Sequence, residues 1–167
     1  MTDFILEACV DSVESALAAA RGGASRLELC GSLVIGGTTP NPWLFQEIRK
    51  HTDIRIHVLI RPRFGDFCYT NEEFVLIREA VKEFRKLGAE GVVIGCLKPD
   101  GTMNMEQMKI LMEEAEGMSV DVYKRQHISS LCMQETENRQ HLLFLLLSAD
   151  IKSRPHIHTM WRKQKNL

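Results

Sequence analysis

Two arginines separated by one residue provide the clearest capacity for polar chemistry in this sequence. Arg61 and Arg63 follow an apolar run and share one phase of its side-chain alternation. Planar guanidinium groups bind oxyanions through paired hydrogen bonds, so this pair suits a phosphate or a carboxylate. Asp11 and Glu28 are carboxylates that could act beside them as general acid or base. One hypothesis is therefore an enzyme that acts on a small anionic metabolite.

The same arginines have a purely structural interpretation, which the sequence leaves open. Buried charges require partners, because an isolated ion is costly to remove from water. An internal ion-pair network would satisfy both arginines with nearby carboxylates, namely Glu7, Asp11, Glu28 and Asp66. In that case the arginines hold the fold together and bind no ligand.

Short β-rich runs, each followed by a helical pattern, must position these side chains. The runs cover residues 4–10, 26–29, 55–60 and 91–97, and a fifth strand is expected near 118–120. Strands that alternate with helices indicate a parallel α/β sheet with right-handed crossovers. Helix starts are predicted at Asp11 or Ser12, at Asn41 before Pro42, at Thr70 with Glu73, and at Asn104 with Gln107.

The alternation within each run decides between an open sheet and a barrel. Central strands of an open sheet covered by helices are apolar on both faces. Here Glu7, Cys9, Glu28 and His57 alternate with apolar neighbours, so each strand has one polar face. This pattern is typical of a (β/α)8 TIM barrel whose lumen carries a site. Such a barrel needs about 250 residues, so we expect one truncated to about its first four βα units.

Composition argues against several classes of function. The 167 residues contain 21 basic and 22 acidic side chains, which gives no broad basic surface for nucleic acid or an anionic membrane. No apolar stretch approaches the roughly 18 residues that span a bilayer, and the start lacks a secretory signal. The five cysteines are scattered and include no CxxC pair, which argues against disulfides or a zinc knuckle. We expect one cytoplasmic domain with free thiols.

Five motifs, in order along the chain, closely resemble those of the CutC copper homeostasis proteins. They are CVDSVESA from Cys9, RLELC from Arg26, GGTTP from Gly36, IRPR from Ile60 with GDF from Gly65, and GAEGVV from Gly88 with a later DG pair. The resemblance implies a cytoplasmic (β/α)8 barrel that is associated with copper binding and tolerance and is often oligomeric. We therefore expect a homo-oligomer that binds or traffics copper.

The resemblance to copper proteins makes the cysteines candidate ligands. Copper(I) is a soft ion that prefers thiolate and thioether sulfur. Cys9 and Cys30 have the same inward phase on neighbouring predicted strands, which lie about 4.8 Å apart. His57 on the third strand adds an imidazole, and these three residues are the predicted copper(I) ligands. The alternative is that the cysteines are small buried apolar side chains.

The family pattern stops after Val120. The family continues into a fifth strand with the motif FHRAFD, whereas this chain has DVYKRQ from Asp121 onward and no glycine beyond Gly117. We expect residues 1–120 to form the partial barrel and residues 121–167 to form an atypical tail, either disordered or helical. An inactive truncated fragment is therefore a further interpretation.

Three methionines recur at helical spacing in the last expected helix. They are Met105, Met108 and Met112. Methionine commonly fills irregular gaps in a core, so we expect these side chains to be buried, in preference to forming a ladder of copper ligands.

Overall fold

A computed structural model of the chain describes residues 5–122 and 142–144, which form one parallel sheet. The strand order is β5-β4-β3-β2-β1-β6, and each neighbouring pair runs parallel. The strands are β1 (Ile5–Val10), β2 (Arg26–Leu29), β3 (Arg55–Leu59), β4 (Gly91–Ile94), β5 (Ser119–Val122) and β6 (Leu142–Phe144). The predicted parallel α/β fold is confirmed.

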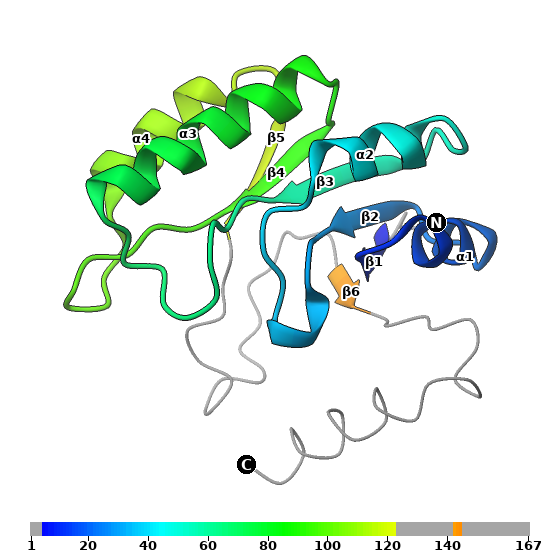
Figure 1. The fold of residues 1–167 in the computed structure, drawn as a ribbon, viewed down its shortest axis with the longest axis horizontal. Helices are drawn as coiled ribbons and strands as arrows, with labels where there is room; N and C mark the ends of the chain where they lie inside the picture. The colour runs from blue at the N-terminus through cyan, green and yellow to red at the C-terminus, as the bar shows by residue number, and fades with distance from the viewer. Residues whose placement is uncertain (1–4, 123–141, 145–167) are drawn as a thin grey trace, which may run out of the picture.

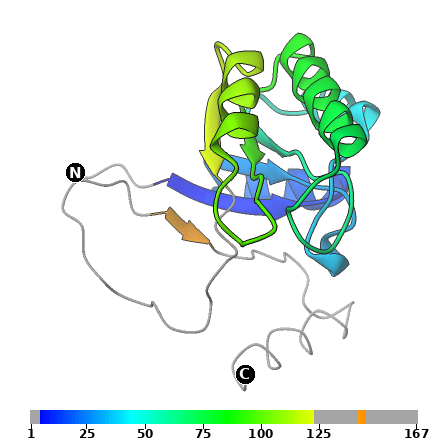
Figure 2. The same cartoon turned by 90° about the vertical axis from the view of Figure 1, so that its left-hand side faces the viewer.

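Within the described ranges, four α-helices connect β1 through β5 and cover one face of the sheet (Figures 1 and 2). They are α1 (Val13–Arg21), α2 (Pro42–Arg49), α3 (Asn71–Lys86) and α4 (Met105–Glu114), and a 3-10 turn, η1 (Leu33–Ile35), follows β2. In Figure 1, α3 and α4 lie side by side above β4 and β5, and their contacts agree with this view. None of the helices in the described ranges has the length and apolar character needed to cross a membrane.

The helices begin where the sequence predicts, because their first turns carry residues that bind free backbone N–H groups. Asn41 Oδ1 accepts a hydrogen bond from the N–H of Trp43 at 2.9 Å, with Pro42 as the first helical residue. Thr70 and Glu73 form the expected reciprocal capping box. Replacing a cap of this kind with alanine typically costs about 1 kcal/mol of stability.

The core lies between the sheet and the helices. Leu27, Ile56 and Val92 point from three strands into this layer, where they are fully buried. Phe45 of α2 and Phe84 of α3 meet there edge to face, with ring centroids 5.9 Å apart. Burial of each large apolar side chain is worth about 1.5–3 kcal/mol, so this layer supplies most of the stability.

The opposite face of the sheet, called here the inner face, carries the polar side chains. Glu7, Arg26, Glu28 and His57 lie on it and are at most 8% exposed. The register places Glu7 beside Arg26 and Glu28 beside His57. The predicted division of each strand into an apolar face and a polar face is therefore present.

The boundary expected at Val120 falls within a strand. β5 continues through Asp121 and Val122, and Val120 and Val122 pack against the core. The expected tail, residues 121–167, also supplies β6, which pairs in parallel with β1. The remainder of that tail lies outside the described residues.

Candidate metal centre

Two thiols, one on β1 and one at the end of β2, share a carboxylate on the inner face. Cys9 of β1 pairs in register with Glu28 of β2, and Cys30 follows directly after β2. The Cys30 thiol lies 3.7 Å from Oε1 of Glu28 and also 3.7 Å from the backbone oxygen of Glu28. The predicted inward phase of both cysteines therefore brings them to the same carboxylate.

Burial keeps both thiols protonated at neutral pH. Burial raises the pKa of Cys9 to about 12, and the negative charges of Glu28 and Glu7 add to the shift. The pKa of Cys30 is raised for the same reasons, burial first and then the charge of Glu28, with Cys9 as a further neighbour. A metal ion must displace these protons to bind thiolate, so binding becomes tighter as pH rises.

Glu28 is the group in this site whose protonation changes near neutral pH. Burial, followed by the charge of Glu7, raises the pKa of Glu28 to about 7. The Cys30 thiol opposes this shift because it hydrogen-bonds to the charged carboxylate. Glu28 can therefore hold or release a proton beside the thiols under physiological conditions.

The loop after β2 covers the Cys30 side of the site. Cys30 packs with Leu59, Val93 and Leu33 in a small apolar cluster separate from the main core. Gly37 lies over it with φ +85°, and a Cβ at Gly37 would lie 3.4 Å from the Cys30 sulfur and 2.7 Å from Leu59. Only glycine fits this close approach without strain.

His57, the third predicted ligand, bonds elsewhere. Its Nδ1 lies 2.7 Å from Oδ2 of Asp121 on β5. Its ring lies flat against Gly91, where an added Cβ would be 2.6 Å from Nε2. Among the described residues, the three-residue group with ligand atoms mutually within 4.8 Å consists of Glu7, His57 and Asp121, and it includes neither cysteine.

Arg26 neutralises this second group. Its Nε bonds Glu7, and its Nη2 lies 3.5 Å from Oδ2 of Asp121. The hydrogen bond from His57, with the charge of Arg26, lowers the pKa of Asp121 against the opposing effect of burial. Because each carboxylate already has a cationic or donating partner, this group has the character of an ion-pair network.

Arg61 connects two loops through hydrogen bonds from its guanidinium group. Few of its N–H groups therefore remain available to bind an anion. Its Nη1 donates to the backbone oxygens of Gly36 and Gly37 at 3.3 and 3.0 Å, and its Nη2 donates to Gly65 at 2.6 Å. The guanidinium also stacks over the Phe67 ring, 4.9 Å from the centroid. The side chain is buried, and its Nε has no hydrogen-bond partner within the described chain.

Arg63 is paired with carboxylates of the β3–α3 region. It donates to Glu73 at 2.5 Å through Nε and to Asp66 at 3.1 Å through Nη2. These hydrogen bonds, from Glu73 first and then Asp66, raise the pKa of Arg63. Of the carboxylates that were expected to pair with Arg61 or Arg63, only Asp66 does so. The remaining candidate, Asp11, accepts the backbone N–H of Leu33 at 3.3 Å.

Sequence reasoning missed Arg26 and Asp121 as members of the polar inner face. Arg26 shares the phase of Glu28 and Cys30, so strand alternation alone could have placed it. Asp121 stands two residues beyond Ser119 with the same phase, but it lies where the family pattern stops. Its contact with His57 depends on the register of β3, β4 and β5.

The fold and the site together define a parallel α/β protein with a thiol pair on its inner face. The CutC family model matches residues 4–138, so the chain belongs to the CutC family. This match continues past the boundary expected at Val120.

Individual relatives agree with this assignment. A CutC family protein of Bacteroides fragilis strain YCH46 is 43% identical over 125 residues, covering 74% of this chain and 50% of the relative. The human copper homeostasis protein cutC homolog is 40% identical over 121 residues, covering 72% of this chain and 44% of the relative. The chain thus spans about half the length of the curated relatives it matches.

A solved structure supports the fold. The crystal structure of a CutC protein from Streptococcus agalactiae superposes with a TM-score of 0.67 at 26% identity. The match covers 72% of this chain and 59% of the other.

Proposed function

We propose that this chain serves copper homeostasis by binding copper(I) through Cys9 and Cys30 on the inner face of a partial (β/α)8 barrel. The observation that carries the proposal is the placement of two thiols beside Glu28, one on β1 and one directly after the adjacent parallel strand β2. Family membership supports copper as the cargo, because relatives carry the name copper homeostasis protein.

The donor set suits a soft monovalent ion. Copper(I) gains more from thiolate than hard ions do, which offsets the displacement of protons from the two thiols. The side chains of Leu33, Leu59 and Val93, which form the apolar cluster beside Cys30, carry none of the oxygen ligands that hard cations prefer. Glu28 can accept a proton released as the Cys30 thiol binds the ion.

His57 is the weaker part of the predicted ligand set. One ring nitrogen faces Asp121 and the other lies against Gly91, so the imidazole must turn before it binds an ion held by the cysteines. We therefore propose the thiol pair as the core of the site, with His57 joining only after such a rearrangement.

A reducing, cytoplasmic location is part of the proposal. Cys9, Cys30, Cys68 and Cys96 are all free thiols. Thiols that must stay reduced to bind copper(I) suit a compartment in which disulfides rarely persist.

An enzyme that binds its anionic substrate through Arg61 and Arg63 is not favoured by the geometry. Both guanidinium groups are occupied by protein oxygens and aromatic rings.

Anaerobic titration of the reduced protein with copper(I), in competition with a chelator of known affinity, tests the proposal. Wild type should bind one ion tightly, and Cys9→Ser with Cys30→Ser should weaken binding by at least tenfold. Cys68→Ser is the matched control, because Cys68 lies in the loop before α3 and should leave the affinity unchanged. Equal affinity in wild type and the double variant would overturn the thiol site.

A further inference from the structure

The segment from residue 32 to residue 37, called here the cover turn, lies over the Cys30 thiol. Leu33 of this turn packs on the apolar cluster that contains Cys30, and a Cβ added at Gly37 would lie 3.4 Å from the sulfur. Cys30 is 1% exposed, whereas Cys9 is partly exposed. A metal ion from solvent should therefore meet Cys9 first and reach Cys30 only when the cover turn moves.

The cover turn has a fixed base and a weakly packed tip. Just outside it, Gly31 and Thr38 exchange two backbone hydrogen bonds of 2.8 Å, which close the base. The tip carries Val34 and Ile35, which are 74% and 48% exposed and contribute little packing. Segments with few buried apolar contacts open at a low free-energy cost. The tip can therefore move while the base stays in place.

The backbone of the cover turn is strained where it begins. Ser32 has φ 49° and ψ 54°, a left-handed conformation in which its Cβ crowds the following carbonyl oxygen. Among the described residues, it is the one residue other than glycine with a positive φ. Strain of this kind persists only where surrounding contacts enforce it. Contacts from outside the turn must therefore hold it closed.

Two side chains that follow neighbouring strands supply these contacts. Asp11 follows β1, and its Oδ2 accepts the backbone N–H of Leu33 at 3.3 Å. Arg61 follows β3 and donates to the two glycine oxygens at the end of the turn, at 3.3 and 3.0 Å. Arg61 also binds Gly65 of another loop, so its loss would disturb more than the turn. Asp11 is exposed, so its contact with the turn can be removed without disturbing the core.

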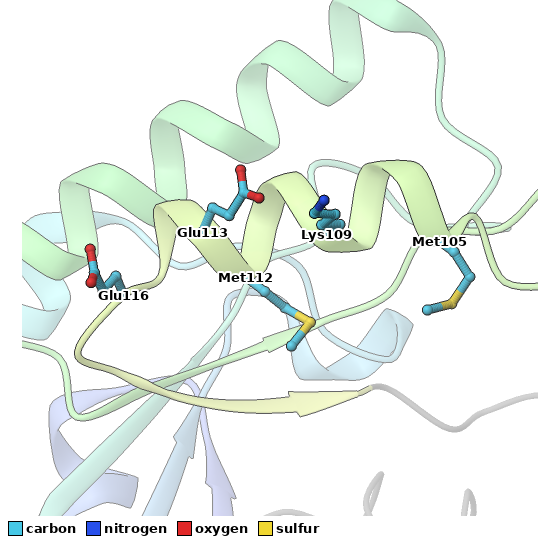
Figure 3. A pocket seen from close by; sticks show the side chains of 5 residues that line it. All are labelled: Met105, Lys109, Met112, Glu113 and Glu116. Atoms are coloured by element: carbon cyan, nitrogen blue, oxygen red, sulfur yellow. The ribbon is translucent and has the colours of Figure 1, made fainter.

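The hollow beside α4 lies elsewhere in the molecule and gives no entrance to the thiols. It measures about 730 Å³, and Figure 3 shows Met105 and Met112 extending from the helix beside it, on the side of β5. These two side chains are 63% and 55% exposed, contrary to the expectation that all three methionines of α4 fill the core. In the sheet, β3 and β4 separate β5 from β1 and β2, where the thiols lie.

We propose that the cover turn is a gate over the thiol site and that Asp11 is the positioning residue that keeps this gate closed. Opening of the turn admits an ion to Cys30, and closure brings Leu33 back over the site and excludes water. The gate sets how fast copper(I) enters and leaves, and it does not change the ligands. The identity of the ion rests on the proposed function, but the gate itself can be tested in the metal-free protein.

Alkylation of the reduced, metal-free protein by iodoacetamide, followed at each cysteine by mass spectrometry, measures the opening. Asp11→Ala should raise the alkylation rate of Cys30 about fivefold, as expected for loss of one hydrogen bond that holds the turn closed. Cys96 is the internal control, because it is also 1% exposed but packs in the main core. Its rate should stay unchanged, and circular dichroism checks that the variant is folded.

Asp11→Asn separates the hydrogen bond from the charge. The pKa of the Cys30 thiol is raised mainly by burial, and the negative charge of Asp11 adds to the rise. The asparagine oxygen still accepts the N–H of Leu33, so Asp11→Asn should keep the alkylation rate of Cys30 near that of wild type. Equal acceleration in the Asn and Ala variants would overturn the gate. So would an unchanged rate in Asp11→Ala, or a parallel rise at Cys96.

Copper(I) exchange with a chelator, followed by stopped flow, relates the gate to the proposed function. Asp11→Ala should speed uptake and release by a similar factor and leave the Kd almost unchanged, because the ligands are the same. A change in Kd carried by only one of the two rates would show that Asp11 shapes the bound site, which would contradict a gate. If wild type binds no copper(I), the proposed function fails, whereas the alkylation rates still decide whether the turn is a gate.

Discussion

The His57 ring lies directly against the backbone of Gly91 on the neighbouring strand. A Cβ at Gly91 would lie 2.6 Å from Nε2 and 2.6 Å from Cδ2 of the ring, closer than a real Cβ comes to other atoms. The absence of a side chain at this position thus allows the imidazole to reach Asp121 across β4, at 2.7 Å.

Replacing Gly91 with alanine should therefore destabilise the protein. We expect a loss of about 1–3 kcal/mol in the free energy of unfolding, because the ring must move and lose its bond to Asp121. Urea unfolding measures this loss. Gly22→Ala serves as the control, since its φ of −75° is one that alanine adopts readily.

A double-mutant cycle separates the steric clash from other effects. In a His57→Ala background the added methyl group has no ring to meet, so Gly91→Ala should cost much less than in wild type. An equal cost in both backgrounds would contradict the contact described here.

The local parts of this fold were predictable because their signals lie within a few residues. The cap at Thr70 and Glu73 is complete within one turn, and the strand from Arg26 to Leu29 has the predicted bounds. The inward phase of Cys9 and Cys30 follows from alternation alone. These features need no knowledge of the rest of the chain.

The partners of the charged side chains were less predictable because they depend on tertiary structure. His57 meets Asp121, a residue 64 positions away, through the register of three strands. Arg61 binds backbone oxygens, which carry no sequence signal. Met112 has the same residue type and helical spacing as buried Met108, yet it faces outward because of how α4 lies on the sheet.

Glu28 should make stability fall as pH rises. Burial raises its pKa from an ordinary value of 4.5 to about 7 in the folded protein. Between these two pKa values the folded state holds a proton that the unfolded state has released, so protonation of Glu28 favours folding. This stabilisation is fully present below pH 4.5 and is lost as pH rises through 7. The shift corresponds to about 3 kcal/mol.

Glu28→Gln removes this titration and should narrow the stability difference between pH 5 and pH 8. Urea unfolding at both pH values gives the comparison, with Glu106→Gln at an exposed position of α4 as the control. If wild type and Glu28→Gln show the same pH dependence, Glu28 does not titrate as described.

Arg61 should act as a structural clamp that binds no anion. Arg61→Ala leaves the oxygens of Gly36, Gly37 and Gly65 without their donor and should cost about 2–4 kcal/mol of stability. Arg55→Ala at the exposed start of β3 should cost far less.

Thermal unfolding of wild type in phosphate or a carboxylate buffer of matched ionic strength should show no specific rise in Tm, whereas a rise that Arg61→Ala abolishes would favour an anion site.

The ligands of bound copper test the central claim most directly. X-ray absorption at the copper edge of the copper(I)-loaded protein, prepared without oxygen, reports which elements surround the ion. The Cys9 and Cys30 site predicts sulfur neighbours in wild type, and their loss in Cys9→Ser with Cys30→Ser. Sulfur neighbours that persist in the double variant, or a wild-type spectrum with only nitrogen and oxygen around copper, would contradict it.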